Sequence, residues 1–597
     1  MSDVCDVIIV GAGPVGATAA LILADYGIQC TVVEARNRPQ SHPAAHVLST
    51  RSLEIWREIG LERDIRRLSA PMHELRSIAY CTTLAGPELG RVPLVDDLPD
   101  TQLDAIESIS PTRNAHLPQN ALEPLLWKHL RDSEHIDVRT GWRYSSHTEG
   151  TDGVAVRITD TTTAASRTIQ AGYLIAADGA AGTVRRALQV KVEGPVLQHV
   201  ISVHFSADLE DFRRHRRGPV IWTYNAKGVG AFIVHRSPQD LVFQIPYFPP
   251  FESLDDFPAG VCRNHIADAI GDPAVDIDVK SIQSWAMHAQ VATNYQVGRV
   301  FLVGDAAHRF PPTGGLGLNT GVADVHNLAW KLAWVIDGRA GEGLLNTYES
   351  ERRPVGIAAT ADSVANFEGL FEVVAALGLP RRAIRLLPQV VAAVPEWIPR
   401  RPVRALIRGL TSLAYQRFRL AKSPGAVGRR IRRRAAAAIT GQGAHYRSWG
   451  RDLGVRYQNG AMIGDGLPAP PDDPQFYTPC VRAGGRLPHA WVKDGDRRVS
   501  TLDMVRRDEL TLLVSAEAHA AWLLAAEGLP LSVVPLVGDA NHVFHSGVAG
   551  ADPDGLMVRP DGHITAVLHS GRDGAPLLRQ ALQVIGASSP ARKGPTA

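Results

Sequence analysis

Short apolar runs alternate with helix-like segments at the start of the chain. Residues 7–10 (VIIV) are apolar, rich in β-branched side chains and bounded by glycine, which predicts a buried parallel strand. Residues 17–23 (ATAALIL) continue as an apolar helical run, and a second strand is predicted at residues 30–33, ending at Glu34. This order of strand, helix and strand is typical of an α/β domain.

The turn between the first strand and the helix has a glycine pattern suited to phosphate binding. Gly11, Gly13 and Gly16 form GxGxxG; the three positions serve the tight turn, close approach to a pyrophosphate and close packing of helix on strand. Glu34 follows about 20 residues later, where a carboxylate accepts bonds from a ribose hydroxyl, and Ala35 stands beside it. The alternative is a glycine-rich turn of another α/β protein. That alternative does not account for the acidic residue Glu34 at the distance from the glycines that nucleotide binding requires. We therefore predict dinucleotide binding.

A second stretch, residues 298–321 (GRVFLVGDAAHRFPPTGGLGLNTG), has a similar strand–turn–helix order. We expect a strand at 300–303, a turn at Gly304 and Asp305, and a helix near 323–335. The Asp305 side chain is placed to accept from a ribitol or ribose hydroxyl. The backbone N–H groups of Gly315, Leu316, Gly317, Leu318 and Asn319 are placed to hold an electron-rich ring oxygen. Alone the stretch also fits an ordinary strand–loop–helix; together, the two predict a flavin bound between them.

The middle of the chain changes to a period of two. Residues 138–173 predict a short β-meander, and residues 200–285 alternate between apolar and polar positions with many aromatic side chains. That alternation predicts an antiparallel sheet with one buried face. We expect two or three of its side chains to contact a substrate. The candidates are His204, Trp222, Tyr224, Phe232, His235, Phe243 and Tyr247.

Length and composition exclude several classes. A chain of 597 residues with 45% hydrophobic content should form more than one domain, and a net charge of +2 gives no reason to expect nucleic acid. Five scattered cysteines without a CxxC argue against a disulfide reductase and favour the cytoplasm. No apolar run approaches the roughly 20 residues of a membrane helix, and the first strand begins too early for a signal peptide. We predict no metal site.

The two stretches, with YLIAADGAAGTVRRAL, AHVLSTRSLEIWREIGLE, IAYCTTLAGPELGRVP and HLPQNALEPLL, resemble the single-component flavoprotein aromatic hydroxylases of the para-hydroxybenzoate hydroxylase fold. The resemblance extends to the longer phenol-hydroxylase branch that includes 2-hydroxybiphenyl 3-monooxygenase and 2,4-dichlorophenol hydroxylase. The resemblance implies an α/β fold: an FAD-binding Rossmann-like domain, an inserted antiparallel β-sheet substrate domain and a C-terminal thioredoxin-like α/β domain. The expected divisions are 1–190 and 286–400 for FAD binding, 191–285 for the substrate sheet, 401–456 for a helical linker and 457–597 for the C-terminal domain.

The resemblance also implies the chemistry. FAD, bound without a covalent link and reduced by transiently bound NADH or NADPH, would form a C4a-hydroperoxide with O2 and hydroxylate a phenolic or polycyclic aromatic substrate. The expected assembly is a homodimer. One alternative is a Baeyer–Villiger-type or other oxidation of a polycyclic metabolite on the same scaffold. An alternative of another class is a flavin-binding protein without turnover.

Site residues follow from the resemblance position by position. His46 corresponds to a residue near the substrate hydroxyl, so we expect it to act as the base that removes the phenol proton. Pro312 and the glycines after it would form the floor beside the reacting ring. Gln119 and Asp178, the latter in a motif resembling DGxxSxxR, correspond to FAD contacts. His116 is a second candidate near the substrate.

Four features depart from the family or extend beyond its motifs. Ala44 stands where an arginine contacts the pyrophosphate, a contact that Arg51 or Arg113 would have to replace, and Gly182 stands where the second motif has serine. The arginine run at 429–434 is expected on a solvated helix face. In the C-terminal region, strands are predicted at ELTLLVSA and LSVVPLV and a hairpin turn at Asp561-Gly562. Because this region lacks CxxC, we expect a structural role, at a subunit interface.

Overall fold

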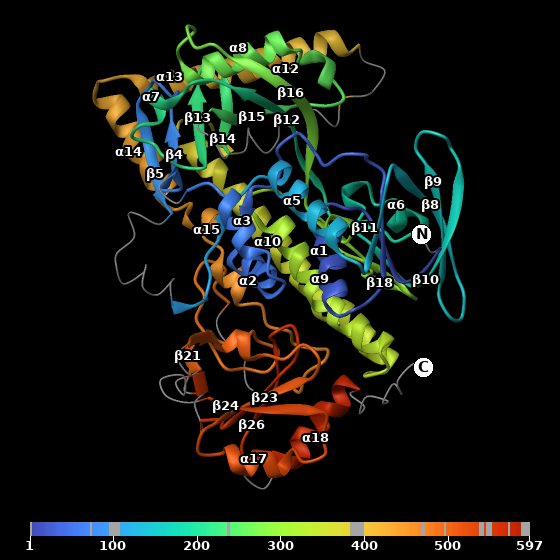
Figure 1. Ribbon diagram of the computed structural model, residues 1–597. Helices are drawn as coiled ribbons and strands as arrows, with labels where there is room; N and C mark the ends of the chain where they lie inside the picture. The colour runs from blue at the N-terminus through green and yellow to red at the C-terminus, as the bar shows by residue number, and fades with distance from the viewer. Residues whose placement is uncertain are drawn as a thin grey trace.

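The computed structural model describes residues 3–71, 74–94, 108–235, 239–381, 394, 399–466, 472–494, 497–536, 543–544, 552–570 and 574–586. Three bodies follow one another in space (Figure 1). A sheet with helix α8 lies at the top of the view, the nucleotide-binding α/β domain with the long helix α9 in the middle, and a C-terminal α/β domain at the bottom. No helix within the described ranges is long and apolar enough to cross a membrane.

The α/β domain is built on a sheet whose main path runs β18-β19-β10-β1-β2-β7. Strands β1 (Val4–Val10), β2 (Cys30–Glu34), β7 (Ile136–Thr140), β10 (Ser166–Ala176) and β19 (Val300–Leu302) pair in parallel. Helices α1 (Pro14–Asp25), α5 (Gln119–Asp132) and α9 (Leu316–Ile336) pack beside them. The predicted strands at 7–10, 30–33 and 300–303 are confirmed, whereas α9 begins at residue 316 and not near 323.

Smaller elements complete this domain. The predicted meander is confirmed, because β8 (Trp142–Glu149) and β9 (Val154–Asp160) pair antiparallel with each other and β9 pairs with β10. Helix α2 (Thr50–Glu58) begins where the Ser49 side chain accepts from the Ser52 N–H. The remaining short elements are β3 (Val47–Leu48), α3 (Glu62–Leu68), β6 (Ala115–His116), α6 (Thr183–Ala187), β11 (Val192–Glu193), β17 (Gln290–Ala292), β18 (Gln296–Val297) and β20 (His308–Arg309).

The second sheet has seven strands in the order β16-β12-β15-β14-β13-β4-β5. They are β12 (Val196–Ser206), β13 (Val220–Asn225), β14 (Gly228–Val234), β15 (Asp240–Tyr247), β16 (Asp278–His288), β4 (Ser77–Cys81) and β5 (Glu88–Pro93), antiparallel except at β13–β4. Strands β4 and β5 come from residues 77–93, inside the division 1–190. Helix α8 (Ala259–Ile270) packs on one face of this sheet, and a short helix α7 (Glu210–Arg213) lies at its end.

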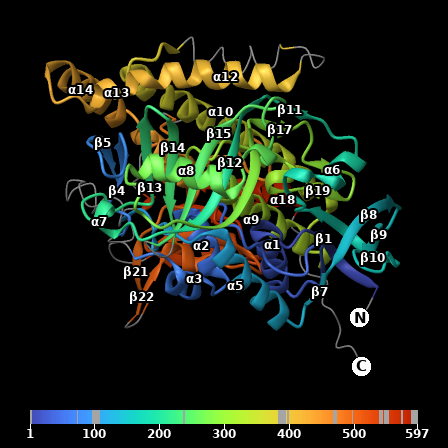
Figure 2. The same ribbon diagram turned by 90° about the horizontal axis from the view of Figure 1, so that it is seen from above.

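Helices from the second half of the chain cover the other face. Helix α10 (Thr347–Ala376) follows α9, and α12 (Arg400–Tyr415), α13 (Arg419–Lys422), α14 (Ala426–Thr440), α15 (Gly443–Tyr446) and α16 (Trp449–Leu453) fill the division 401–456. Helix α12 runs along the edge of the molecule in the view from above (Figure 2). On α14, Arg429, Arg430, Arg433 and Arg434 are exposed, as predicted for a solvated face. Its Ile439 packs with Tyr80 and Val373, so these helices wall the sheet as well as connect domains.

The C-terminal domain has a four-stranded sheet in the order β24-β23-β25-β26. Strands β23 (Leu510–Ser515) and β24 (Leu531–Leu536) are parallel and joined through α17 (His519–Ala525). Strands β25 (Gly555–Val558) and β26 (Ile564–Leu568) form the predicted hairpin, followed by α18 (Gly574–Ile585). A two-stranded ribbon, β21 (Trp491–Asp494) and β22 (Arg497–Ser500), precedes them. This order is the thioredoxin-like arrangement that the sequence predicts.

Buried ion pairs fasten this domain to the α/β domain of the same chain. Arg559 donates to both oxygens of Glu351 at 2.8 and 2.7 Å and to Asp561 at 2.7 Å, and Lys331 of α9 donates to Glu351 at 2.7 Å. All four side chains are at most 1% exposed. The Asp561-Gly562 turn, predicted only as a hairpin turn, is therefore also part of a buried contact between the two domains.

Candidate active site

The glycine-rich turn has the geometry that a pyrophosphate needs. Gly11 has a φ of +106°, and a Cβ there would lie 2.3 Å from the carbonyl oxygen of Ala177. A Cβ on Gly16 would lie 2.0 Å from the carbonyl oxygen of Gly11. Gly13 is the N-cap of α1 and has open space beside it. The turn is therefore closely packed at Gly11 and Gly16 and open beside Gly13. There the unpaired N–H groups of a 12-residue helix can meet an anion.

The carboxylate at the end of β2 is held in place. Glu34 is 6% exposed; it accepts from the N–H groups of Ala12 and Arg36, each at 2.9 Å. Although burial opposes ionisation, the bonds from Arg36 keep the pKa of Glu34 below its ordinary value. Gln119, the first residue of α5, donates to Glu123 at 2.6 Å, and Arg36 also pairs with Glu123. Glu34, the half-buried Ala35 and Gln119 thus lie around one end of the glycine turn.

The second stretch brings another helix start to the same domain. Asp305 is exposed in the turn after β19, and Pro312 is exposed at the wall of a large cavity. Gly315 caps the 21-residue helix α9 with a φ of +65°, so the N–H groups of Leu316, Gly317 and Leu318 have no intrahelical acceptor. No atom would lie within 4 Å of a Cβ on Gly317. This open helix start suits an electron-rich ring oxygen.

The side chain of Asn319, whose backbone N–H is the expected cofactor contact, has a separate part in the structure. Its side-chain oxygen accepts from the Ser49 N–H at 2.9 Å and the Ser52 hydroxyl at 2.8 Å, and its amide donates to the carbonyls of Val47 and Gly315. The side chain is fully used in joining α9 to the segment that carries His46. We infer that Asn319 positions the site rather than donating its side chain to a cofactor.

The second nucleotide motif also shows why it departs from the family pattern. Asp178 accepts from the Val184 N–H at 2.9 Å, while its other oxygen is buried without a partner and burial raises the pKa of the carboxyl. Gly182 has a φ of +51°, and a Cβ there would lie 2.9 Å from Nε of Arg185. A serine at 182 would be strained and crowded in this chain. The unpaired Asp178 oxygen is free to receive a donor from a bound cofactor.

Arg51 and Arg113, the candidates to compensate for the arginine missing at position 44, have other surroundings in the structure. Arg51 is 6% exposed; it donates to Glu54 at 2.9 Å and to the carbonyl oxygen of Asp561 at 2.7 Å. It is committed to the contact with the C-terminal domain, so the suggestion that it replaces the pyrophosphate contact is wrong. Arg113 is exposed on the surface.

The glycine turn gives a direct prediction. We expect Gly16→Ala to lose FAD, because its Cβ would collide with the Gly11 carbonyl and push α1 away from β1. The measurement is the flavin-to-protein absorbance ratio after purification. Gly260→Ala in α8 is the matched control, since a Cβ there meets no atom within 4 Å. Full flavin content in the Gly16 variant would contradict the role assigned to this turn.

His46 belongs to a cluster of three imidazoles at the cavity wall. The ring centroids of His46 and His116 are 4.8 Å apart, and those of His46 and His235 are 5.8 Å apart. The His116 Nε2 bonds to the carbonyl oxygen of Val234 at 2.8 Å; Nδ1 of His46 and both nitrogens of His235 are buried without partners. One nitrogen from each ring lies within 4.8 Å of the others, so this cluster could also hold a transition-metal ion.

Burial keeps all three imidazoles neutral. It lowers the pKa of His46 far below its ordinary value, with His116 and His235 adding to the effect, and lowers the pKa of His116 to about 4 and of His235 to about 3. A neutral imidazole can accept a proton or a hydrogen bond at neutral pH. The geometry therefore places a neutral imidazole, that of His46, at the wall of the cavity.

The neutral cluster predicts how stability depends on pH. The folded pKa of His116 lies below its unfolded value, so the unfolded chain binds a proton that the folded chain does not as pH falls from about 6.5 towards 4. Stability should therefore decrease over this range, by up to about 1.4 kcal/mol per pH unit for each such histidine. His116→Gln keeps a donor for Val234 and should flatten the melting temperature against pH between 7 and 5. An unchanged slope would contradict the assignment.

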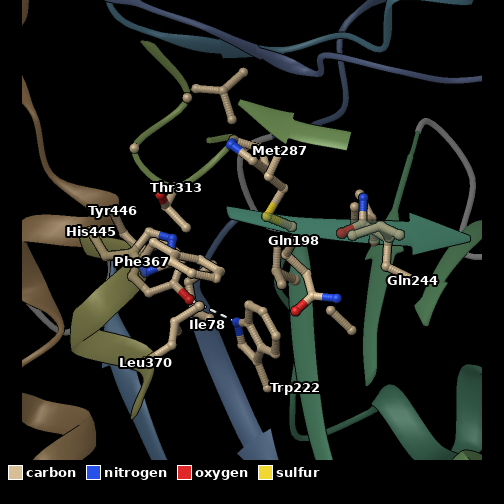
Figure 3. A pocket seen from close by; sticks show the side chains of 18 of the residues that line it. Ile78, Gln198, Trp222, Gln244, Met287, Thr313, Phe367, Leu370, His445 and Tyr446 are labelled. Atoms are coloured by element: carbon tan, nitrogen blue, oxygen red, sulfur yellow. Dashed lines mark hydrogen bonds between the residues drawn. The ribbon is translucent and has the colours of Figure 1, made fainter. Parts of the chain in front are cut away.

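The cavity has a volume of about 1030 Å³ and lies between the seven-stranded sheet, α9 and α10. His46, Pro312, Gly315, Leu316 and Asn319 line it from the nucleotide side. Figure 3 shows Gln198 and Met287 facing His445, Tyr446 and Phe367 across it. The cavity thus joins the start of α9, in the second flavin-binding stretch, to a wide apolar chamber.

The period of two in each strand decides which predicted side chains line this chamber. Trp222 and Tyr224 of β13 and His116 of β6 do so. Phe232 and Phe243 pair in register and pack in the core on the α8 side, as does Tyr247. His204 bonds to Asp240 at 2.7 Å outside the chamber. Placing Phe232, Phe243 and His204 in the lining was therefore wrong, because alternation reveals two faces without saying which is inward.

Other lining residues gave no signal in the sequence. Gln198, Gln244 and Met287 are single polar or flexible residues of the sheet strands, and His445 and Tyr446 come from the division predicted as a linker. Helix α10 contributes a row of apolar side chains at helical spacing, which any buried helix also has. These are Val364, Phe367, Leu370, Phe371 and Val374.

Comparison with known proteins agrees with this geometry. An FAD-binding domain model matches residues 4–363, and a model of the aromatic-ring hydroxylase C-terminal domain matches residues 481–588. The chain is 31% identical to the 2,4-dichlorophenol 6-monooxygenase of Cupriavidus pinatubonensis, covering 94% of this chain and 92% of that protein. It is 33% identical to a putative polyketide hydroxylase of Streptomyces coelicolor, with the same coverage.

Among solved structures, the flavin-dependent monooxygenase PieE, in complex with FAD and substrate, is similar with a TM-score of 0.84 and 31% identity over 98% of this chain and 99% of that one. These matches do not favour the alternatives of a Baeyer–Villiger oxidation or a non-catalytic flavoprotein. The cradle at Gly11–Gly16, the unpaired Asp178 oxygen and the open start of α9 fit FAD. The chain belongs to the FAD-dependent aromatic-ring hydroxylases, monooxygenases that use NAD(P)H and O2 to hydroxylate a phenolic or polycyclic aromatic compound.

Proposed function

We propose that the substrate is a phenol of several fused rings, such as an aromatic polyketide, and not a single-ring phenol. The volume of the cavity carries this proposal. At about 1030 Å³ the whole cavity is at the upper end of ligand pockets, with room for the flavin ring and a ligand beside it. A single phenol would leave most of this space to water, which these enzymes must exclude from the reacting oxygen. The similarity to a polyketide hydroxylase supports the same choice.

The lining suits a flat ring system. Trp222, Tyr224 and Phe367 offer aromatic surfaces, and Gln198 and Gln244 offer amide groups at separate points of the wall. A few polar groups in an apolar chamber fix the orientation of a ligand. A substrate of fused rings with more than one oxygen atom would therefore be held in one orientation, with one ring near Pro312.

In this proposal His46 accepts the proton of the hydroxyl on the ring that is oxygenated. The supporting observations are that His46 lines the cavity and that its imidazole is neutral. FAD, once bound and reduced, supplies the activated oxygen. The remaining tasks belong to the chain: the chamber excludes water and orients the ring, Pro312 and Gly315 form the floor beside it, and His46 raises the electron density of the ring by favouring the phenolate. Gly11, Gly13, Gly16, Glu34 and Asp178 would hold the dinucleotide.

Ligand binding tests the substrate class. We expect oxidised holoenzyme to bind 2-hydroxyfluorene, a three-ring phenol, at least about tenfold more tightly than 2,4-dichlorophenol by calorimetry, because more apolar surface leaves water. Tighter binding of 2,4-dichlorophenol would instead support the second candidate, a chlorophenol hydroxylase, which the similarity to the Cupriavidus enzyme favours.

We also propose that the enzyme works as a homodimer in the cytoplasm. Its five cysteines are all free, which suits a reducing compartment. Large apolar side chains are exposed on α12 to α14, at Leu406, Leu413, Leu420 and Val427, and contiguous exposed apolar surface commonly marks an interface. Light scattering after gel filtration should give twice the chain mass for the wild type. The Leu413→Glu variant should give a lower mass. A monomeric wild type would contradict the dimer.

A further inference from the structure

We propose that Tyr446, with His445, forms a hydrogen-bonding subsite for a ketone or quinone oxygen of the substrate. This rests on the proposed function and deepens it, because it names a second functional group that the fused-ring phenol must carry. The two residues lie on α15, in the division expected to be a linker, and both line the cavity. Neither touches the cluster of His46, His116 and His235 in any hydrogen bond that the described residues make.

The hydrogen bonds around the Tyr446 hydroxyl fix its direction. The Trp222 indole N–H donates to this oxygen at 2.8 Å, and the Tyr80 hydroxyl lies 2.8 Å from it (Figure 3 shows the bond from Trp222). Tyr80 is fully buried, and among the described residues its hydroxyl bonds to Tyr446 alone. A buried hydroxyl proton needs an acceptor, so Tyr80 donates to Tyr446 and not the reverse.

Tyr446 therefore accepts two hydrogen bonds and keeps its own proton. Both lone pairs of its oxygen are occupied, and the proton has no acceptor among the described side chains that bond to it. Burial raises the pKa of Tyr446 well above its ordinary value, so the proton stays on the oxygen. Since the ring lines the cavity, this O–H is available to a ligand. Two donors bound to the oxygen also strengthen the third bond it can make.

His445 provides an independent observation at the same place. Its ring stacks on the Tyr446 ring with centroids 4.2 Å apart and an angle of 3° between the planes. The side chain is 6% exposed, and its Nδ1 is buried without a partner. Burial lowers its pKa to about 3, so the ring is neutral and carries one N–H. The neutral His445 ring supports the Tyr446 ring by stacking on it, and the unused Tyr446 hydroxyl proton indicates a ligand that accepts from it.

The chemistry selects the ligand class. An O–H donor favours an acceptor such as a carbonyl oxygen over an aromatic C–H at the same place. A neutral donor in an apolar wall suits an uncharged ketone better than a carboxylate, which would bury a charge without a cation. Ring ketones conjugated with a phenol, as in hydroxyanthraquinones, combine a planar fused system with such an oxygen. Tyr446 would then set which fused-ring phenols the enzyme accepts and how they lie in the chamber.

The test compares matched ligands on matched variants. Calorimetry with oxidised holoenzyme would measure the dissociation constants of 2-hydroxy-9-fluorenone and 1-hydroxyanthraquinone, which carry ketones, and of 2-hydroxyfluorene, which does not. We expect Tyr446→Phe to weaken the tighter ketone by about 5- to 10-fold and to change 2-hydroxyfluorene less than twofold. Tyr80→Phe removes a hydroxyl of the same network but leaves the Tyr446 proton facing the cavity, so it should keep the preference for the ketone.

Each result decides the matter. Equal weakening of ketone and non-ketone ligands by Tyr446→Phe, or no weakening, would overturn the subsite while leaving the proposed function in place. A wild-type enzyme that binds none of the three-ring phenols would contradict the proposed function and the subsite together. Flavin content and melting temperature of each variant, measured in the same samples, show whether the fold is retained; the ratio of the two affinities within one variant does not depend on the fraction folded.

Discussion

Replacing His46 with alanine should lower the rate of hydroxylation by about 10²- to 10⁴-fold while leaving the flavin content unchanged. The imidazole lines the cavity and is neutral, so it is placed to take the phenol proton. Without it the ring must react as the neutral phenol, which is less electron-rich. The measurement is the rate of product formation per flavin from 2-hydroxyfluorene, quantified by chromatography.

Two further observations separate a base from a packing residue. The loss should shrink as pH approaches the pKa of the phenol, near 10, because phenolate then forms in solution. The loss of hydroxylation rate should also be smaller for a more acidic phenol. His204→Gln is the matched control, because His204 lies on β12, bonds to Asp240 and does not line the cavity. A His46 variant whose deficit is the same at every pH would contradict proton removal by His46.

The buried ion network between the domains should give the largest effect on stability. Arg559→Met would leave Glu351 and Asp561 buried with less compensation, and removing one partner of such a group costs about 3–5 kcal/mol. Although burial opposes ionisation, Arg559 and Lys331 lower the pKa of Glu351 to about 2. We expect a melting temperature several degrees lower than that of the wild type, measured on the holoenzyme by calorimetry.

The Arg559→Met variant should also retain less flavin than the wild type. Lys331 belongs to α9, whose start contributes to the flavin site, and Glu351 belongs to α10, which walls the cavity. Arg57→Ala is the control at the same domain contact: it removes a half-exposed pair with Asp503, and exposed pairs contribute about 0–1 kcal/mol. If both variants melted at the wild-type temperature, the C-terminal domain would not depend on this network.

Local patterns in the sequence were enough for the nucleotide-binding elements. Gly11, Gly16 and Glu34 act within one βαβ unit, so their spacing already determines their geometry. The strands at 7–10, 30–33 and 300–303 are found where the apolar runs predict them. The sequence predicts the start of α9 too late, because glycines such as Gly315 and Gly317 favour a loop. A helix whose first turn binds a ligand tolerates glycine where close approach matters more than propensity.

The chamber depended on contacts between distant segments, and these have no local signature. Trp222 and Phe232 look equally suited to line a pocket, and only the packing of α8 on one face of the sheet separates them. Asp561 has the pattern of an ordinary turn residue, because its contact with Arg51 depends on how the two domains dock. Tyr446 was missed for the same reason: its partners Tyr80 and Trp222 are more than 200 positions earlier in the chain.

We propose that this hydroxylase acts on a fused-ring phenol. The most direct measurement is the oxidation of NADPH and of NADH by holoenzyme in the presence of 2-hydroxyfluorene, 1-hydroxyanthraquinone or 2,4-dichlorophenol, with hydroxylated product and hydrogen peroxide quantified together. We predict that a three-ring phenol gives the highest ratio of product to reductant consumed, with little peroxide, because it fills the chamber and excludes water. Efficient hydroxylation of 2,4-dichlorophenol, with only peroxide from the three-ring phenols, would contradict a fused-ring phenol as the substrate.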